Sequence, residues 1–329
     1  MKFAPILLGI LSLFLLFADP IPDLGFSKGV SPLNLKSDPE YSSSQSCGSC
    51  HLKEHDEWEE SRHSLAYTNP IFQDGLSAEN KNECKNCHGP IESNRSEGVN
   101  CSTCHLRENK ILTASNGLDS SVHTFEKTNI LSSSEFCANC HQFNFHKVKN
   151  GVSILTEDPM QNTYEEWRRY SQRTPNALSC QGCHMPKGAH VFKGAHDIKY
   201  LKSSIQLEVV RIKDGIFFSI STKNIGHNFP TGDLFRHATL EVKQSGSDFK
   251  VIDRIGRTFR TRWDEKNQET IKFVESDSSI KLGEIRKLKF KSALPIQYRL
   301  LYHYTSEKDE ERGNVPLNLT IRQIASGEI

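Results

Sequence analysis

CGSCH, at residues 47–51, is the first of five copies of the pattern Cys-x-x-Cys-His in this chain of 329 residues. The other copies are CKNCH at 84–88, CSTCH at 101–105, CANCH at 137–141 and CQGCH at 180–184. The copies contain all ten cysteines of the chain: Cys47, Cys50, Cys84, Cys87, Cys101, Cys104, Cys137, Cys140, Cys180 and Cys183. One repeated chemistry therefore accounts for every cysteine.

This pattern is the attachment signature of c-type haem. The two cysteines form thioether bonds to the haem vinyl groups, and the adjacent histidine is the proximal ligand of the iron. The proximal ligands are then His51, His88, His105, His141 and His184. Zinc ribbons need their cysteine pairs in twos and do not require a histidine after each pair. A disulfide framework would not explain five identical spacings. The sequence predicts five covalently bound haems c.

The composition agrees with a cofactor-rich interior. Apolar residues make up 36% of the chain, which is low for a globular protein of this size. Five buried macrocycles would supply the missing apolar surface. The formal charge of +1 omits about two propionates per haem, so we expect a mildly acidic holoprotein. The sequence shows no strongly basic patch of the kind that would indicate nucleic-acid binding.

The N-terminus has the pattern of an export signal. Met1-Lys2 precedes an apolar run that ends near residue 18, which is short for a stable membrane span. We predict a signal peptide or signal anchor over 1–18 and a flexible linker over 19–46, which is rich in Pro, Ser, Asp and Gly. The predicted location is periplasmic or otherwise exported, with membrane association through the N-terminus if the signal stays uncleaved.

The rest of the chain divides into two predicted domains of an α+β protein. Residues 47–203 form a mostly helical and irregular pentahaem cytochrome c domain, with about thirty residues per haem and helices at 52–67 and 162–172. Residues 204–329 alternate apolar and polar side chains and form an antiparallel, immunoglobulin-like β-sandwich. Strands are expected at 205–209, 216–221, 238–243, 249–255, 271–275, 285–291, 297–304 and 316–324.

The histidines outside the motifs decide how many irons have a second ligand. A low-spin electron-transfer haem commonly takes a second histidine, whereas a haem without one is open to substrate. Candidate distal ligands are His63, His123, His146, His190, His196 and His227. The alternative for each is a solvated or hydrogen-bonded histidine of the ordinary kind. His55 is expected at the surface, and His237 and His303 are expected to be ordinary residues of the sandwich.

Several stretches resemble one family of multihaem cytochromes. They are Trp58-x-x-Ser61-x-His63 after the first motif, Gly98-Val99-Asn100 before the third, and Met185-Pro186 after the fifth. The family is that of the tetrahaem electron acceptor of hydroxylamine oxidoreductase, and the loop around His227 is similar to one in multihaem proteins with a C-terminal β-sandwich. The resemblance implies closely packed haem pairs, with His63 and either His190 or His196 as distal ligands. Five motifs in place of four prevent the haem order from being carried over.

The sequence therefore predicts an exported protein that transfers electrons along closely packed, mostly bis-histidine haems. Its partners would be redox proteins, either other cytochromes or a membrane quinol oxidoreductase. The alternative is a reductase of a small nitrogen or sulfur compound at one five-coordinate haem. The supply of nine histidines beyond the motifs favours the carrier, and the absence of a Cys-x-x-Cys-Lys site weakens the resemblance to pentahaem nitrite reductases.

Overall fold

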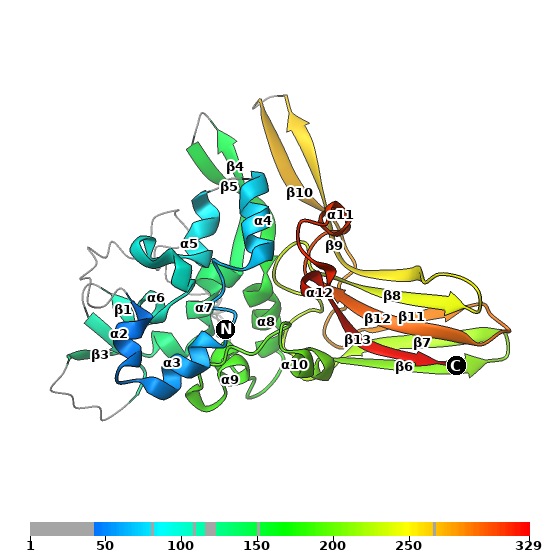
Figure 1. Ribbon diagram of the computed structural model, residues 1–329, viewed down its shortest axis with the longest axis horizontal. Coiled ribbons are helices and arrows are strands. Elements are labelled where there is room, and N and C mark those ends of the chain that lie inside the picture. The colour runs from blue at the N-terminus through cyan, green and yellow to red at the C-terminus, as the bar shows by residue number, and fades with distance from the viewer. Residues whose placement is uncertain (1–42, 80–81, 108–109, 116–122, 150–151, 266–267) are drawn as a thin grey trace, which may run out of the picture.

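The chain forms two regions that lie side by side (Figure 1), one carrying the five motifs and one built of sheets. The predicted signal at 1–18 lies outside the described residues, as does the linker at 19–46 except for its last four residues. Those four are not linker, because Ser43 caps helix α2 by accepting a hydrogen bond from the Gln45 amide. The computed structural model describes residues 43–79, 82–107, 110–115, 123–149, 152–265 and 268–329.

Short helices dominate the motif-bearing region. The α-helices are α2 (Ser44–Gly48), α3 (Leu52–Glu59), α4 (Pro70–Glu79), α5 (Lys85–His88), α6 (Cys101–His105), α7 (Ser134–His141), α8 (Thr163–Ser171), α9 (Cys180–His184) and α10 (Ile198–Ser203). Short 3-10 turns lie at η1 (Asn82–Cys84), η2 (Glu92–Glu97), η3 (Ile130–Ser132) and η4 (Pro186–Gly188). The strands of this region are β1 (Leu106–Arg107), β2 (Lys110–Thr113), β3 (Phe125–Lys127), β4 (Gln142–Lys149) and β5 (Val152–Asn162).

Each motif lies in or beside one of these short helices. In a helix, residues at positions i, i+3 and i+4 share a face, so a helical Cys-x-x-Cys-His presents both sulfurs and the imidazole to the same side. Polar residues start two of these helices: the side chain of Asn100 accepts from the Thr103 amide, and that of Ser179 accepts from the Gly182 amide. The local sequence thus determines the orientation of the motif side chains.

The helix expected at 52–67 is shorter than predicted, because α3 ends at Glu59. The Ser64 hydroxyl donates to the carbonyl oxygens of Glu59 and Ser61, at 2.7 and 2.8 Å. Serine side chains that bond the backbone in this way compete with the helix. The chain therefore leaves the helical path and brings His63 into the interior. The helix expected at 162–172 is α8, Thr163–Ser171.

Two antiparallel sheets make up the C-terminal region. Their strands are β6 (Ile205–Ile212), β7 (Gly215–Thr222), β8 (His237–Gln244), β9 (Lys250–Asp264), β10 (Glu269–Asp277), β11 (Ile285–Phe290), β12 (Ile296–His303) and β13 (Ile321–Glu328). One sheet has the order β10-β9-β8-β12-β13 and the other β11-β7-β6. The sequence predicted a strand near each of these eight positions.

Both sheets contribute to one hydrophobic core, with Ile216 and Phe218 of β7 packed among Leu240 of β8 and Leu300 of β12. Figure 1 shows the two layers, with β6 and β7 below β8 and β12. The strand expected at 316–324 begins later, because residues after Pro316 form the helical turn α12 (Leu317–Thr320). A further short helix, α11 (Glu307–Arg312), follows β12.

The two regions meet at several points. Helix α10 ends at Ser203, two residues before β6, and packs against β6 and β13. The β9–β10 hairpin extends beyond the sheets towards β4 and β5 (Figure 1). Arg257 of β9 donates to the carbonyl oxygens of Pro159 and Met160, at 3.0 and 2.7 Å. Arg257 also donates to the Gly232 carbonyl at 3.0 Å, so it links the long loop between β7 and β8 to β5 of the motif-bearing region.

Candidate haem-binding site

All five motifs open onto one continuous cavity of about 2160 Å³. Its lining includes all ten cysteines and all five motif histidines. The volume is more than twice the upper end of the range for a single small-molecule pocket, about 300 to 1000 Å³. All ten cysteines are free, so the structure does not support a disulfide framework. Among the described residues, no cluster of three or more His, Cys, Asp or Glu side chains is placed to hold a bare metal ion.

Hydrogen bonds set the tautomer of three motif histidines. The Nδ1 atoms of His88 and His105 donate to the carbonyl oxygens of Ala66 and Leu112, at 3.0 and 2.9 Å. His184 makes the same kind of bond to the carbonyl of Lys193. A carbonyl oxygen can only accept, so the proton is on Nδ1 and the Nε2 lone pair is free. This is the state in which an imidazole binds a metal.

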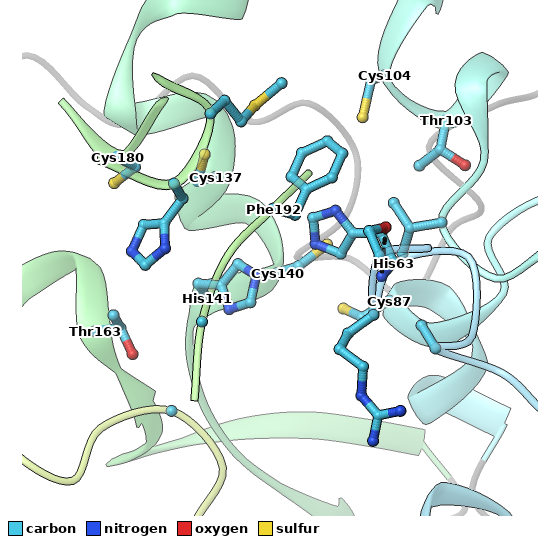
Figure 2. A pocket seen from close by; sticks show the side chains of 18 of the residues that line it. His63, Cys87, Thr103, Cys104, Cys137, Cys140, His141, Thr163, Cys180 and Phe192 are labelled. Carbon is cyan, nitrogen blue, oxygen red and sulfur yellow. Dashed lines mark hydrogen bonds between the residues drawn. The ribbon is translucent and has the colours of Figure 1, made fainter. Parts of the chain in front are cut away.

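Four of the predicted distal histidines lie opposite motif histidines from distant parts of the chain. The ring centres of His51 and His123 are 6.3 Å apart, and those of His105 and His190 are 6.0 Å apart. The same distance is 6.4 Å for His63 with His141 and for His184 with His227. Figure 2 shows His63 and His141 facing each other across the cavity, with the sulfurs of Cys87 and Cys140 nearby.

These separations match two imidazoles that share one iron. A metal–imidazole bond is about 2 Å long, and a ring nitrogen lies about 1.1 Å from its ring centre, so the ring centres would be about 6.2 Å apart. A direct ring–ring contact would be closer, as in the stack of His237 on His303 at 4.3 Å. The four pairs therefore leave between them the space that a haem iron needs.

Three of the paired histidines, His63, His141 and His227, are also held neutral, as metal ligands must be. Burial lowers the pKa of His63 to about 3 and that of His141 to about 4. Burial likewise lowers the pKa of His227 to about 4, although its Nδ1 donates to the Asn228 carbonyl at 2.9 Å. At physiological pH these imidazoles carry no charge, because desolvation disfavours the protonated form.

His227 comes from the sheet region and enters the cavity on the loop between β7 and β8. Glu166 of α8 anchors this loop, since its Oε2 accepts from the Asn228 amide at 3.1 Å and from the Thr231 hydroxyl at 2.7 Å. The loop lies tightly against α8. A Cβ atom at Gly226 would lie 2.8 Å from the Tyr170 ring, so only glycine fits there without a shift.

The second motif differs from the other four. Phe72 stacks on His88, with ring centres 3.9 Å apart and an interplanar angle of 8°. Within the described ranges, no other histidine ring faces His88. Two charged residues of the β7–β8 loop, Asp233 and Arg236, act electrostatically on His88. Among the described side chains, the surroundings of this motif are thus aromatic and charged, and no imidazole lies opposite the motif histidine.

Contacts between cysteines show which motifs are neighbours. Cys47 of the first motif is close enough to hydrogen-bond with Cys101 of the third. Cys87 of the second motif approaches Cys140 of the fourth in the same way. The fourth and fifth motifs meet through Cys137 and Cys180. Cys104 of the third motif also acts electrostatically on Cys137 and Cys140 of the fourth, so the fourth motif lies among the second, third and fifth.

The two remaining distal candidates have different positions. The prediction that His196 is a distal ligand finds no support, because its ring stacks on Tyr304 at 4.1 Å and its Nδ1 accepts from Arg62 at 3.0 Å. In the described part of the chain, it faces no motif histidine. His146 lies in β4 opposite Leu155, and its side chain is outside the described part of the structure.

The other three histidines lie away from the cavity lining. His237 and His303 lie buried in strands β8 and β12. His55 is more enclosed than predicted, with a side chain 13% exposed and packed against Trp58. Its place beside Gly48 explains this, because a Cβ atom at Gly48 would lie 2.5 Å from the His55 ring, and glycine leaves that space free.

Sequence reasoning missed residues whose role depends on distant contacts. Phe192 packs on His63 at 4.2 Å and lies 6.1 Å from His190, so it separates two imidazole pairs. Glu166 anchors the His227 loop, and Phe72 supports His88. No local pattern distinguishes these residues from other helical or loop residues. Only Phe192 had a signal, its position two residues after a candidate ligand.

Comparison with known proteins gives a fold. No family model and no curated protein sequence matches the chain. The solved structure of a penta-haem cytochrome c552 from Thermochromatium tepidum is similar, with a TM-score of 0.65 and 18% sequence identity, over 87% of this chain and 98% of that one.

Two solved superoxide reductases also match in part. One is an oxidised superoxide reductase, with a TM-score of 0.21 and 13% identity over 39% of this chain and 86% of that one. The other is a reduced superoxide reductase (neelaredoxin) variant from Archaeoglobus fulgidus, with a TM-score of 0.20 and 18% identity over 34% and 86%. No helix among the described residues is long and apolar enough to span a membrane. The chain has the fold of a pentahaem cytochrome c.

Proposed function

We propose that the protein is an exported pentahaem c-type cytochrome that transfers electrons between redox partners. The observation that carries this proposal is the set of four imidazole pairs, whose ring centres are 6.0 to 6.4 Å apart and frame the space for an iron. The ten motif cysteines would attach five haems, and the motif histidines would be the proximal ligands. Bound haem supplies one-electron Fe(III)/Fe(II) chemistry, with potentials set by the ligands and by burial.

In this proposal the distal ligands are His123, His190, His63 and His227, for the first, third, fourth and fifth haem. The cysteine contacts support an order in which the first haem neighbours the third, and the fourth neighbours the second, third and fifth. The fourth haem would then be the branching point for electrons. The partners would be other cytochromes or a membrane quinol oxidoreductase, and the location periplasmic or otherwise exported.

The structural role of the C-terminal region follows from the same pairs. We propose that it is an immunoglobulin-like sandwich that supplies His227 to the fifth haem. Its two antiparallel sheets around one core support this assignment. The kinship with the tetrahaem electron acceptor family also stays a proposal, supported by the positions of His63 and His190 opposite motif histidines.

The experiment is electron paramagnetic resonance of the oxidised holoprotein, after a haem assay has established five haems per chain. We expect low-spin signals from at least four haems, and a single high-spin signal if the second haem lacks a distal ligand. Replacing His63 or His190 by alanine should add one high-spin haem in each case. If neither variant changes the spin count, the proposed pairing is wrong.

A second candidate function is reduction of a small nitrogen or sulfur compound at the second haem. The stacked Phe72 and the charged residues that act on His88 favour a reductase function at the second haem and not at the other four. His146 is the competing interpretation, as a distal ligand that would close the site. If His146→Ala adds a high-spin haem to the wild-type count, the carrier function accounts for all five haems. If the count stays the same and nitrite or cyanide shifts the high-spin signal, the second haem binds substrate.

A further inference from the structure

The four imidazole pairs differ in the angle between their two rings. His184 and His227 are nearly parallel, with an interplanar angle of 9°. The other three pairs are twisted by similar angles: 37° for His51 with His123, 34° for His63 with His141, and 31° for His105 with His190. One pair is thus set apart from the other three by the orientation of its rings.

Hydrogen bonding at Nδ1 divides the pairs in the same way. In the parallel pair both rings donate from Nδ1 to a carbonyl oxygen, of Lys193 for His184 and of Asn228 for His227. In the twisted pairs the Nδ1 atoms of the distal rings are buried and have no hydrogen-bond partner among the described residues: His63, His123 and His190. The Gly188 carbonyl acts on His190 but does not satisfy the distance and angle of a hydrogen bond. A metal-ligating imidazole is usually oriented by such a bond, so another contact must orient these three rings.

A phenylalanine ring packs against each of the three distal rings. Phe125 lies edge-on to His123, with ring centres 4.5 Å apart and an interplanar angle of 77°. Phe192 contacts two distal rings. Its ring centre is 4.2 Å from that of His63 (Figure 2) and 6.1 Å from that of His190. Aromatic rings attract each other at these separations, so the contacts hold the imidazoles in fixed orientations.

The phenylalanines belong to a repeated pattern, His-x-Phe, at 123–125, 190–192 and 227–229. In the third copy the phenylalanine has a different neighbour: Phe229 is 4% exposed in the core of the sheets and packs on Tyr302, with ring centres 5.7 Å apart. His227 is oriented by its hydrogen bond to Asn228, and its pair is the parallel one. The twist therefore accompanies the phenylalanine contact and not the sequence pattern.

The backbone of Phe192 is held in a strained conformation. Its φ is +42°, in a region that bulky residues rarely adopt. Such strain persists only where the surrounding contacts over-determine it, and it concentrates at functional sites. The next residue, Lys193, donates its amide to the His184 carbonyl at 3.2 Å and accepts from the His184 ring. The segment is thus tied to the fifth motif, while its phenylalanine ring lies between the distal histidines of the third and fourth.

We propose that Phe125 and Phe192 are positioning residues that replace a hydrogen bond and hold three distal imidazoles twisted against their motif histidines. This inference rests on the proposed haem ligation. The plane of an imidazole selects the iron d orbital that overlaps its π electrons, so the angle between two ligand planes sets the g values of a ferric haem. Hydrogen bonding at the ligands also tunes the reduction potential. The protein then has two classes of bis-histidine haem: the fifth is parallel, and the first, third and fourth are twisted.

The test is electron paramagnetic resonance of the holoprotein during a potentiometric titration, which resolves the signals of individual haems. Phe192→Leu and Phe125→Leu keep an apolar side chain and remove the aromatic ring. Phe136→Leu is the matched control. Phe136 also lines the cavity and has Arg107 5.8 Å from its ring centre, and in the described part of the chain no histidine ring packs against it.

We expect Phe192→Leu to change two signals, those of the third and fourth haem. Their largest g values should fall towards that of the fifth haem, because the freed rings can approach the parallel arrangement. Phe125→Leu should change one signal in the same direction, that of the first haem, and Phe136→Leu should give the wild-type spectrum. His63→Ala and His190→Ala assign the signals, since each removes the low-spin signal of its own haem.

The inference is overturned if both Phe192→Leu and Phe125→Leu give wild-type g values, or if Phe136→Leu shifts the same signals. A shift of the fifth haem as large as that of the third and fourth in Phe192→Leu also overturns it. If one leucine variant does not bind five haems, the other decides by the same criterion.

The wild-type spin count reports separately on the proposed function. Fewer than four low-spin haems in the wild type would contradict the histidine pairing itself. Four or more low-spin haems whose g values do not change in either leucine variant would contradict only the role of the phenylalanines.

Discussion

The region before residue 204 and the region after it build their interiors from different materials. Among the described residues, eight hydrophobic side chains are buried in the first region and eighteen in the second. The sheet region packs Phe218 and Leu300 into one hydrophobic core, whereas the motif-bearing region arranges its cysteines and motif histidines around a cavity of about 2160 Å³. The sheet region can therefore be stable through its side chains, and the other region depends on what it binds.

The difference between the two regions should have its largest effect on their resistance to proteolysis when haem attachment is prevented. In full-length protein expressed where haem is not attached, we expect residues 47–203 to be digested while residues 204–329 survive. The reason is that the first region then lacks most of its apolar interior, as in proteins whose metal supplies their folding energy. Limited proteolysis with mass spectrometry measures this. Equal protection of both regions would contradict the comparison.

The next largest effect is expected in the core of the sheets. Phe218 is fully buried, and Phe218→Ala should lower the free energy of unfolding by about 3 to 5 kcal/mol. Val210→Ala is the control, because Val210 is 54% exposed on β6 and its truncation should cost less than about 0.5 kcal/mol. Urea unfolding followed by circular dichroism measures both. A loss in Phe218→Ala no larger than in the control would show that the sheets do not carry this core.

The stacked pair His237 and His303 predicts a pH dependence of the sheet region. Burial, and then the neighbouring His303, lowers the pKa of His237 to about 4, against about 6.5 in the unfolded chain. Arg254 also lowers it, and Glu307, at 3.4 Å, opposes the shift. Below pH 6.5 the unfolded chain takes up a proton that the folded chain does not, so stability falls as the pH drops towards 4.

The expected loss is about 2 to 3 kcal/mol between pH 6.5 and 4, since each pKa unit corresponds to about 1.4 kcal/mol. Urea unfolding at a series of pH values measures it. His237→Asn should flatten this slope whatever its effect on stability at pH 7. An unchanged slope in the variant would assign the pH dependence to other groups.

The smallest effect tests the link between the two regions. Glu166→Gln should weaken the anchor of the His227 loop by about 1.5 kcal/mol, the worth of a hydrogen bond to a charged group. The population with His227 detached would rise about tenfold, and electron paramagnetic resonance should show more high-spin haem. Glu165→Gln is the control, because Glu165 pairs with Arg168 and Arg169 and does not touch the loop. Equal spectra in both variants would show that the loop holds His227 without Glu166.

The features that depend on local chemistry could be predicted from the residues alone. The Cys-x-x-Cys-His spacing predicts which residues face one side of a short helix, because the geometry spans only five residues. Alternation of apolar and polar residues predicted the positions of the eight strands for the same reason. The strand prediction was wrong at Leu317–Thr320, where a helical turn intervenes. The helix prediction was wrong after Glu59, because Ser64 ends α3 early.

Which histidine faces which motif depends on the tertiary fold. His63 and His141 are 78 residues apart and meet at 6.4 Å, and His227 reaches His184 from the other region. His196 had the same sequence signal as His190, yet Arg62 and Tyr304 engage it instead. Such pairings depend on the paths of loops and on packing between distant segments, which residue spacing does not encode.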